Sequence, residues 1–217
     1  MSNSPAKNRI LKKIRMALAH PTPLPFPEKP GSDSVFQPRQ QDLVVEFAEQ
    51  FTALQGKFIF CIDEQELRTN FEKLCYQNQW TKLYCQEEKW KELVLPTSLY
   101  NDIESCEASI TSCEFLIART GSMVLSSVQQ GRVPAVYAPV HVCIAYTSQL
   151  VYDLSDGLKA MKQKYAPKMP SLITFATGPS RTADIEKTLV VGVHGPREVY
   201  CFVVEDSGSA GSNVALD

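Results

Sequence analysis

The spacing of hydrophobic positions changes along this chain, and each change predicts a different kind of element. Between residues 5 and 19 the apolar side chains recur at helical spacing, which predicts a helix with one narrow apolar face. That face holds Ile10, Leu11, Ile14 and Leu18, and the opposite side holds Lys7, Arg9, Lys12, Lys13 and Arg15. We interpret this segment as a docking helix with a solvated basic face; a helix that binds a partner or a membrane surface is the alternative.

The next segment, residues 20–38, contains six of the fourteen prolines. Proline fixes φ and removes a backbone donor, so this segment is predicted to be an extended arm. We therefore expect an N-terminal helix and arm over residues 1–38 and a main domain over residues 39–206. The tail, residues 207–217, is rich in Gly and Ser and is predicted to be disordered.

From about residue 40 the pattern alternates between helical and extended periods. Helices are predicted around Leu43–Leu54, after the capping residue Asp63, and over Asp153–Tyr165. Strands are predicted at Lys57–Ile62 and near 81–85, 108–111, 115–118, 123–126, 140–146, 172–176, 188–193 and 199–204. This alternation predicts an α/β fold with a mainly parallel sheet flanked by helices.

The composition narrows the classes of function. The chain has 217 residues, of which 21% are charged, and a net charge of −2. That length suits one α/β domain with extra pieces, and the absence of a basic field argues against nucleic acid as the main partner. No apolar run approaches about 18 residues and no signal-peptide block starts the sequence. We therefore expect a cytoplasmic protein without a membrane span.

Seven cysteines stand at positions 61, 75, 85, 106, 113, 143 and 201, and no two have C-x-x-C spacing. Most lie in apolar settings, where a reduced thiol behaves as a small hydrophobic group. We therefore expect free thiols in a reducing compartment. Because short-spaced thiolate clusters are missing, no iron–sulfur or zinc site is expected on this chain, and no cofactor is assigned to it.

The densest group of candidate functional residues lies in Thr177–Glu186. Gly178 and Pro179 end a predicted strand, and exposed amides at the start of the next element can bind an anion. The ligand-binding candidates here are Gly178, Ser180, Arg181 and Thr182, with the arginine fork matching a carboxylate or a phosphate. The alternative is an ordinary capped turn in which Arg181 pairs with Asp184 or Glu186.

Two further turns carry candidate residues. In Gly192–Glu198, His194 could carry protons and Arg197 could hold an acid group, unless the segment is only a structured turn. The other turn joins two predicted strands and could form a small oxyanion-binding nest or a plain hairpin turn. Its ligand-binding candidates are Thr120, Gly121 and Ser122.

His141 is the last ligand-binding candidate, because it follows Pro139 at the start of a predicted strand. Established catalytic motifs give no further guidance. The patterns H-E-x-x-H, G-x-S-x-G, G-x-G-x-x-G and Walker A are absent from the sequence. Their absence argues against zinc proteases, α/β-hydrolases, dinucleotide-binding Rossmann domains and P-loop enzymes.

Taken in order, these motifs resemble a known family. They are Ala118-Arg119-Thr120-Gly121-Ser122 with Val124-Leu125, Pro139-Val140-His141-Val142, the run from Thr177 to Glu186, and Gly192-Val193-His194-Gly195-Pro196-Arg197-Glu198. The resemblance is to the LUD-domain family, and within it to the lactate-utilisation protein C group, over residues 40–205.

The resemblance implies a fold similar to the sugar-phosphate isomerase and CoA-transferase group. It also implies a bacterial cytoplasmic subunit that works with two partner subunits in oxidising L-lactate to pyruvate. In that system the iron–sulfur clusters belong to the partner subunits. Arg119 stands where many family members carry an acidic residue, so we expect this edge of the pocket to be more cationic.

We interpret the chain as an accessory subunit with a pocket for a small anionic ligand. Arg181 and Arg197 would bind acid groups, and Glu186 and His194 are the candidate catalytic proton carriers. One alternative is a stand-alone enzyme of the CoA-transferase or isomerase type, with Glu186 as nucleophile or base. Another is a structural or regulatory partner with a relict pocket. Whether the chain is itself an enzyme, and whether it forms a homo-oligomer, stays open at this level.

Overall fold

The computed structural model describes residues 5–19, 38–39, 41–94, 98–128, 133–182, 190–192 and 194–206. The chain divides into two compact units, Met1–Pro38 and Arg39–Asp217. In the first unit, α1 (Pro5–Leu18) occupies the segment where the sequence predicted a helix, and none of its residues is buried. Apolar side chains such as Ile14 are exposed there together with the basic ones.

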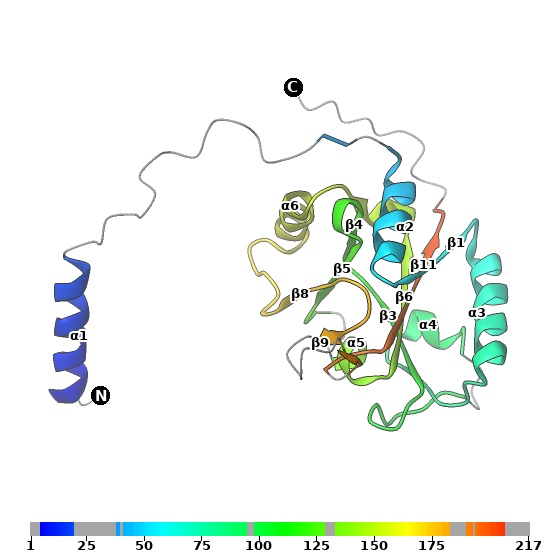
Figure 1. The fold of residues 1–217 in the computed structure, drawn as a ribbon, viewed down its shortest axis with the longest axis horizontal. Coiled ribbons are helices and arrows are strands. Elements are labelled where there is room, and N and C mark those ends of the chain that lie inside the picture. Colours follow the sequence, from blue (N-terminus) through cyan, green and yellow to red (C-terminus); the bar gives the residue numbers. More distant parts are fainter. Residues whose placement is uncertain are drawn as a thin grey trace. The chain divides into compact units, whose positions relative to one another are not determined.

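A five-stranded parallel sheet forms the centre of the second unit (Figure 1). Its strands, in spatial order, are β1 (Lys57–Cys61), β11 (Glu198–Val204), β6 (Val140–Tyr146), β3 (Ala108–Ser112) and β2 (Leu83–Cys85). Every neighbouring pair in this sheet is parallel. The predicted α/β class with a mainly parallel sheet is therefore confirmed.

Both faces of this sheet are buried, because its central strands alternate between two cores. Along β11, Tyr200, Phe202 and Val204 belong to one core, and Val199, Cys201 and Val203 belong to the other. The helices α3 (Glu64–Asn78) and α4 (Glu88–Lys91) cover the first face. The helix α2 (Leu43–Ala53) covers the second face through Phe47 and Phe51.

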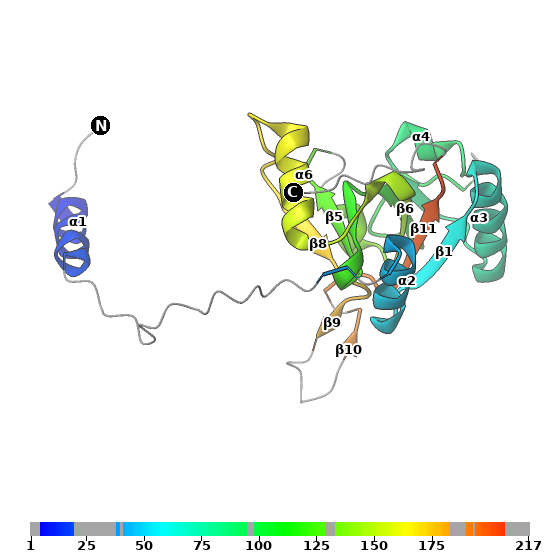
Figure 2. The ribbon, with the colours of Figure 1, turned by 90° about the horizontal axis from the view of Figure 1, so that it is seen from above.

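A second sheet also packs on that second face. Its strands, in spatial order, are β7 (Leu150–Val151), β4 (Phe115–Ile117), β5 (Ser122–Ser126) and β8 (Ile173–Ala176). The strand β5 is antiparallel to both neighbours, whereas β4 and β7 are parallel. The helix α6 (Leu154–Tyr165) covers the outer face, where Met161 joins a buried cluster with Ile117 and Val124. Figures 1 and 2 show the resulting layers in the order α3, five-stranded sheet, four-stranded sheet and α6.

Most longer elements lie where the sequence predicted them, but several short ones were not predicted. These are α4, η1 (Ala118–Thr120), α5 (Val133–Tyr137), η2 (Thr147–Gln149), β7 and β9 (Arg181–Thr182), which forms a two-stranded ribbon with β10 (Val190–Val191). Elements of two to five residues do not span enough positions to show a helical or extended period. Only the packing around them determines that they form.

Aspartate residues begin the three long helices of the second unit. Asp63 accepts a hydrogen bond from the amide of Glu66 at 2.7 Å, as the sequence predicted for this cap. Asp42 and Asp153 accept amide hydrogen bonds at the starts of α2 and α6 in the same way. Each cap satisfies a donor that the first turn of a helix leaves without an intrahelical partner.

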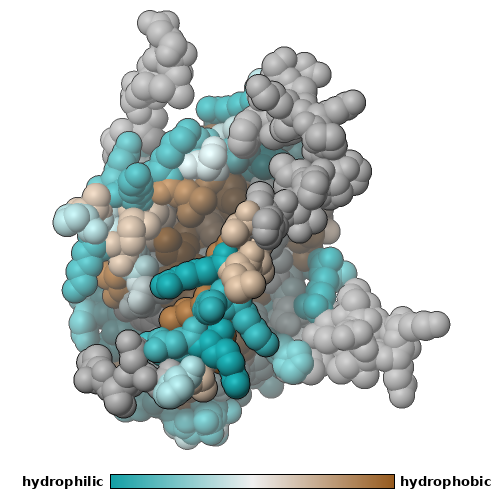
Figure 3. All heavy atoms as spheres, turned by 90° about the vertical axis from the view of Figure 1, so that its left-hand side faces the viewer, coloured by the Kyte–Doolittle hydropathy of each residue, from teal (hydrophilic) through white to brown (hydrophobic). Residues whose placement is uncertain are grey.

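All seven cysteines are free thiols, and all except Cys75 are buried. Every helix within the described ranges is too short or too polar to cross a membrane. Some large apolar side chains of the second unit are exposed to solvent, among them Leu158, Met169 and Leu172. Figure 3 shows hydrophobic atoms between hydrophilic side chains on the side of the molecule drawn there.

Candidate functional site

Three segments that the sequence singled out meet in the structure. Ser122 Oγ lies 2.8 Å from Thr177 Oγ1, which joins the first turn to the segment after β8. The amide of Ser180 donates to the carbonyl of Pro196 at 2.9 Å, and the amide of Gly192 donates to the carbonyl of Ser180 at 3.0 Å. We call this meeting point of residues 120–122, 177–182 and 194–197 the three-segment junction.

Two glycines let the junction pack closely against the end of α2. Gly121 has φ +60°, and a Cβ atom there would lie 2.6 Å from the amide nitrogen of Phe51. Gly178 has φ +70°, and a Cβ atom there would lie 2.6 Å from the carbonyl oxygen of Leu54. A larger residue would meet both the strain of left-handed backbone and a clash with backbone atoms that cannot move aside. These turns therefore require glycine for their shape.

Arg181 is exposed, and its guanidinium donates to the carbonyl oxygen of Leu54 at the C-terminus of α2. A cation at this position compensates the partial negative charge of the helix end. Asp184 and Glu186, the partners proposed for Arg181 in the plain capped turn, lie outside the described residues. The same holds for Glu186 as a catalytic candidate, and only the backbone of Thr182 is described, in β9.

Arg197 and His194 are both exposed. The amide of Arg197 donates to the carbonyl of Pro139 at 2.9 Å, so this segment is anchored at the start of β6. Residues 194–197 lead into β11 and therefore lie at the amino edge of the five-stranded sheet. Ligands of open α/β sheets usually bind at the carboxyl ends of strands, and in the junction only the turns after β4 and β8 of the second sheet lie at such ends. The difference arises because the chain returns from the second sheet to begin a parallel strand, which it must enter at its amino end.

Several hydrogen-bond donors of the junction are already used within the protein. The hydroxyls of Thr120 and Ser122 lie 2.8 Å apart, and that of Ser122 is also bonded to Thr177. The amide of Gly121 donates to Ala118, and the amide of Ser180 donates to Pro196, as noted above. A ligand would therefore be held mainly by the exposed side chains of the junction rather than by a nest of backbone amides.

An ion pair borders the junction at the start of β11. Lys57 Nζ lies 2.6 Å from Glu198 Oε2 and donates to the Tyr200 hydroxyl at 2.7 Å. The hydrogen bond from Lys57 lowers the pKa of Glu198. Burial alone would lower the pKa of Lys57, but the bonds to Glu198 and Tyr200 outweigh it and raise that pKa. Both groups stay charged at neutral pH, and their charges offset each other beside Arg197.

His141 is buried, with an exposed fraction of 1%. Its Nε2 lies 2.8 Å from the hydroxyl of Thr111 on the neighbouring strand β3. Burial lowers the pKa of His141 to about 4, so the ring is neutral at physiological pH. The structure therefore places this predicted ligand-binding residue inside the sheet, between β3 and β11, and not on the surface of the junction.

The sequence led us to expect that Arg119 makes this edge of the pocket more cationic. In the structure the charge of Arg119 is paired instead. Its Nε donates to Asp153 Oδ2 at 2.5 Å, and the Asp153 side chain is 7% exposed. Burial would raise the pKa of Asp153, but the bonds from the Ser155 amide and from Arg119 outweigh it and lower that pKa. The charge of Arg119 is thus paired with the carboxylate that caps α6.

The motifs and the fold of this chain match a known protein family. The sequence pattern of the LUD domain matches residues 44–204. The chain belongs to the LUD domain family. The resemblance that the junction motifs suggested is therefore confirmed, and the match covers the whole α/β unit from α2 to β11.

Several relatives of this LUD domain carry the name lactate utilization protein C. The protein from Bacillus licheniformis is 39% identical over 106 residues, which cover 48% of this chain and 44% of that protein. The one from Bacillus subtilis is 36% identical over 106 residues, with the same coverages. A third, from Bacillus mycoides, is 26% identical over 190 residues and covers 77% of this chain. In three of the matches to lactate utilization protein C, including that to the Bacillus licheniformis protein, the chain spans about half the length of the relative.

A solved structure supports the fold of the LUD domain independently. The crystal structure of a DUF162 family protein from Deinococcus radiodurans superimposes with a TM-score of 0.57. The superposition covers 75% of this chain and 96% of that one, at 18% sequence identity. At this identity the likeness establishes the α/β architecture alone.

The sequence did not point to a buried charged cluster in this LUD domain. Glu114 is 1% exposed, and its carboxylate accepts hydrogen bonds from Lys164 and the Tyr165 hydroxyl at 2.8 Å each, and from Ser126. These contacts fasten the last turn of α6 to β5. The only signal in the sequence was a carboxylate inside an apolar run, between Cys113 and Phe115.

A cavity on the α3 side of the LUD domain also lies away from the junction. It has a volume of about 800 Å³ and is lined by the C-terminal half of α3 and by Trp80, Leu83 and Leu93. Among the described residues, no three His, Cys, Asp or Glu side chains are placed to hold a metal ion. The sequence could not indicate this cavity, because its shape depends on how the residues between 71 and 98 pack against one another.

Proposed function

We propose that this chain is an accessory subunit of an iron–sulfur system that oxidises L-lactate to pyruvate. The observation that carries the proposal is the LUD domain match over residues 44–204, together with relatives named lactate utilization protein C. Oxidation of lactate removes two electrons and two protons, one hydrogen from the carbon that bears the hydroxyl group and one from the hydroxyl oxygen. The electrons would pass to iron–sulfur clusters on partner subunits.

The chemistry of the cysteines supports a role without redox centres on this chain. Clusters are held by thiolates, which form readily only where the pKa of a cysteine is low. Here burial raises the pKa of Cys75, Cys85 and Cys106 to about 11. Such thiols stay protonated at neutral pH and serve as small apolar groups of the core. We therefore assign the clusters to the partner subunits.

The three-segment junction is the proposed site for a small anion such as the substrate carboxylate. Arg181 and Arg197 are exposed there and would supply the positive charge. His194, three residues before Arg197, is the candidate proton acceptor, because a neutral imidazole offers a ring nitrogen that can accept a proton. Glu186 is the second candidate proton carrier. The role of the chain would be to bind and orient the anion while a partner subunit accepts the electrons.

The saturated donors of the junction favour a second candidate function. The amides of Gly121 and Ser180 and the hydroxyl of Ser122 are bonded within the protein. A site whose donors are occupied in this way suits a structural or regulatory subunit with a relict pocket. The stand-alone CoA-transferase or isomerase alternative depends on Glu186.

Reconstitution tests the accessory-subunit proposal. The full chain would be co-expressed with iron–sulfur subunits of the lactate-utilisation type and purified without oxygen. We expect a complex that reduces an artificial electron acceptor when L-lactate is added, and we expect the activity to disappear when this chain is left out. Full activity without the chain, or turnover of a CoA ester by the chain alone, would overturn the proposal. An active complex that is unaffected by Arg197→Ala would favour the regulatory role.

A further inference from the structure

Lys57 and Glu198 meet at the amino edge of the five-stranded main sheet, because β1 and β11 both begin there. The two strands are parallel, and Lys57 lies opposite Tyr200 in their register. Opposite residues of neighbouring strands share a face, and so do residues two apart on one strand. The pairing of β1 with β11 therefore places a cation, a carboxylate and a phenol on one face of the sheet.

The carboxylate of Glu198 is held by two donors. Lys57 Nζ lies 2.6 Å from Glu198 Oε2, and the Tyr200 hydroxyl donates to the same oxygen at 3.1 Å. Lys57 also donates to the Tyr200 hydroxyl at 2.7 Å and lies over the ring, 4.6 Å from its centroid. An ammonium group has three donors, and these contacts use two of them. The charge of Lys57 is thus directed at Glu198.

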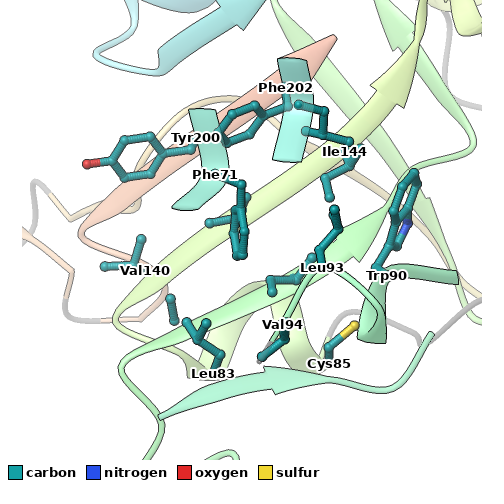
Figure 4. Packing of buried hydrophobic residues seen from close by; sticks show 14 of the residues in the cluster. Phe71, Leu83, Cys85, Trp90, Leu93, Val94, Val140, Ile144, Tyr200 and Phe202 are labelled. Carbon is teal, nitrogen blue, oxygen red and sulfur yellow. The ribbon is translucent and has the colours of Figure 1, made fainter. Parts of the chain in front are cut away.

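The core beneath these groups fixes the position of Tyr200. The residue is 5% exposed, and its ring packs edge-on against Trp80 at a centroid distance of 5.9 Å. Figure 4 shows the ring within the buried cluster, with the hydroxyl group pointing away from the other labelled side chains. Tyr200 therefore gives Lys57 and Glu198 a fixed support, and their contact is a consequence of the fold.

Arg197, the exposed arginine of the three-segment junction, comes immediately before Glu198. Its amide donates to the carbonyl of Pro139 at 2.9 Å, and a Cβ atom at Gly192 would lie 2.9 Å from the Arg197 Cβ. In the part of the chain that the structure describes, Arg197 makes no ion pair. The hydrogen bond from Lys57 is the largest cause of the lowered pKa of Glu198, and the charge of Arg197 adds to it. Glu198 and Arg197 are therefore close enough to interact.

An uncompensated carboxylate at Glu198 would weaken anion binding by Arg197. It would repel a bound anion, and it would compete with that anion for the guanidinium. Lys57 opposes both effects, because it neutralises the carboxylate from a distance of 2.6 Å. The two residues are 141 positions apart in the chain, so this compensation depends on the pairing of β1 with β11.

We propose that Lys57 is a positioning residue of the junction, which holds Glu198 and so keeps Arg197 free to bind a carboxylate or a phosphate. This inference rests on the proposed function, because it assigns a role within the same anion site. Lys57 acts through Glu198 and does not itself contact the ligand. Its contribution should therefore depend on the presence of the Glu198 carboxylate.

A double-mutant cycle tests that dependence. Phosphate and L-lactate would be titrated calorimetrically, at low ionic strength, into the full chain, Lys57→Gln, Glu198→Gln and the double variant. Lys57→Gln should raise the dissociation constant about two- to fivefold, as expected for interactions between exposed charges. Glu198→Gln should bind at least as tightly as the parent. In the Glu198→Gln background, Lys57→Gln should have no further effect, because the carboxylate that it offsets is gone.

Two further variants separate charge from position. Lys57→Arg keeps the cation and its hydrogen bond to Glu198, so it should restore the affinity that Lys57→Gln loses. Lys73→Gln is the matched control, because it removes the same charge from an exposed position of α3. Its dissociation constant should stay close to that of the parent. Thermal unfolding verifies that every variant is folded.

Two results would overturn the role of Lys57 alone. One is an unchanged affinity in Lys57→Gln, and the other is an equal loss with and without Glu198→Gln, which would mean that Lys57 acts through its own charge. A different result would refute the anion site itself, and the role of Lys57 with it. This is a parent protein without saturable binding, or an Arg197→Ala variant that binds as tightly as the parent.

Discussion

The two arginines of the three-segment junction differ in their hydrogen bonds within the protein. Arg197 is exposed, whereas Arg181 also bonds the carbonyl of Leu54 at the end of α2. We predict that Arg197→Ala weakens anion binding by about 1.5–3 kcal/mol, the contribution of a charged hydrogen bond. Its free energy of unfolding should stay unchanged. Arg181→Ala should weaken binding to a similar extent and also lower the melting temperature.

Calorimetric titration with phosphate and with L-lactate measures the binding, and thermal unfolding measures the stability. Lys159→Ala serves as the control, since Lys159 is an exposed cation on α6 that pairs with Asp156 of the same helix. If both arginine variants bind the anion as tightly as the parent and Lys159→Ala do, the junction is not an anion site.

His141 makes stability depend on pH in a predictable direction. Its pKa is about 4 in the folded protein and near 6.5 when unfolded, because burial disfavours the charged ring. Between these values the unfolded state binds more protons, so the free energy of unfolding falls as pH decreases from 6.5 to 4. The loss should reach about 2–3 kcal/mol. Its contribution to the pH dependence should fade above pH 6.5, as the unfolded state also loses this proton.

Urea unfolding at pH 7 and pH 4.5 measures this effect, with His141→Gln as the comparison. Glutamine can still bond the Thr111 hydroxyl, which lies 2.8 Å from the ring nitrogen, but it does not titrate. The variant should lose less stability than the parent over this interval. Parallel losses in both proteins would show that the histidine is not the group responsible.

His141 also shows what a single sequence leaves open at this scale. The residue follows a proline at the start of a strand, a position that fits a ligand-binding histidine as well as a buried one. Its burial depends on Thr111 and on β11, which are 30 residues and more away in the chain. The glycines and arginines were better guides, because turn-forming residues signal local backbone shape.

At the scale of elements, Gly121 and Gly157 give opposite expectations for the same substitution. A Cβ atom at Gly121 would lie 2.6 Å from the Phe51 amide in left-handed backbone, so Gly121→Ala should cost about 2 kcal/mol or more. Gly157 lies inside α6, where a Cβ atom would be 3.5 Å from Ile117. Gly157→Ala should therefore be neutral or stabilise by up to about 1 kcal/mol.

Chemical denaturation of both variants measures the difference. The comparison is informative because both glycines are buried and both variants gain the same methyl group. A Gly121→Ala protein as stable as the parent would mean that α2 does not hold the junction turn in the way described. Anion binding should fall in Gly121→Ala and remain in Gly157→Ala if the turn shapes the site.

The elements that the sequence predicted best are those with the strongest period. The strands β6 and β11 read as apolar runs because both faces are buried, and α3 reads as a helix because Leu67 and Phe71 recur on one side. The division into two sheets could not be predicted, since a strand such as β5 has the same pattern whichever sheet it joins. Pairing partners are a property of tertiary packing.

At the scale of the whole molecule, the chain combines an exposed helix with a self-contained domain. No residue of α1 is buried, and the LUD domain match begins only at residue 44. The motifs of the LUD domain could be recognised from the sequence because they are local runs. The contact between Lys57 and Glu198 could not, because these residues are 141 positions apart and meet only where β1 pairs with β11.

We therefore predict that deletion of residues 1–38 leaves the main domain folded. The two buried clusters of the main sheet draw on residues from Leu43 onward, so the truncated chain keeps its hydrophobic cores. Its thermal transition should stay cooperative, with a melting temperature close to that of the full chain. Circular dichroism and calorimetry measure this, and loss of the transition would show that the N-terminal unit belongs to the core.

The same truncation tests whether α1 docks to the partner subunits. Its five basic residues are Lys7, Arg9, Lys12, Lys13 and Arg15, opposite an apolar stripe, a pattern that suits docking to an acidic partner. We expect the truncated domain to bind anions as before but to lose association with the iron–sulfur subunits in size-exclusion chromatography. Replacing the five basic residues by glutamine in the full chain should have the same effect, since it removes the charge and keeps the helix. Unchanged association in both proteins would assign the contact with the partners to the LUD domain itself.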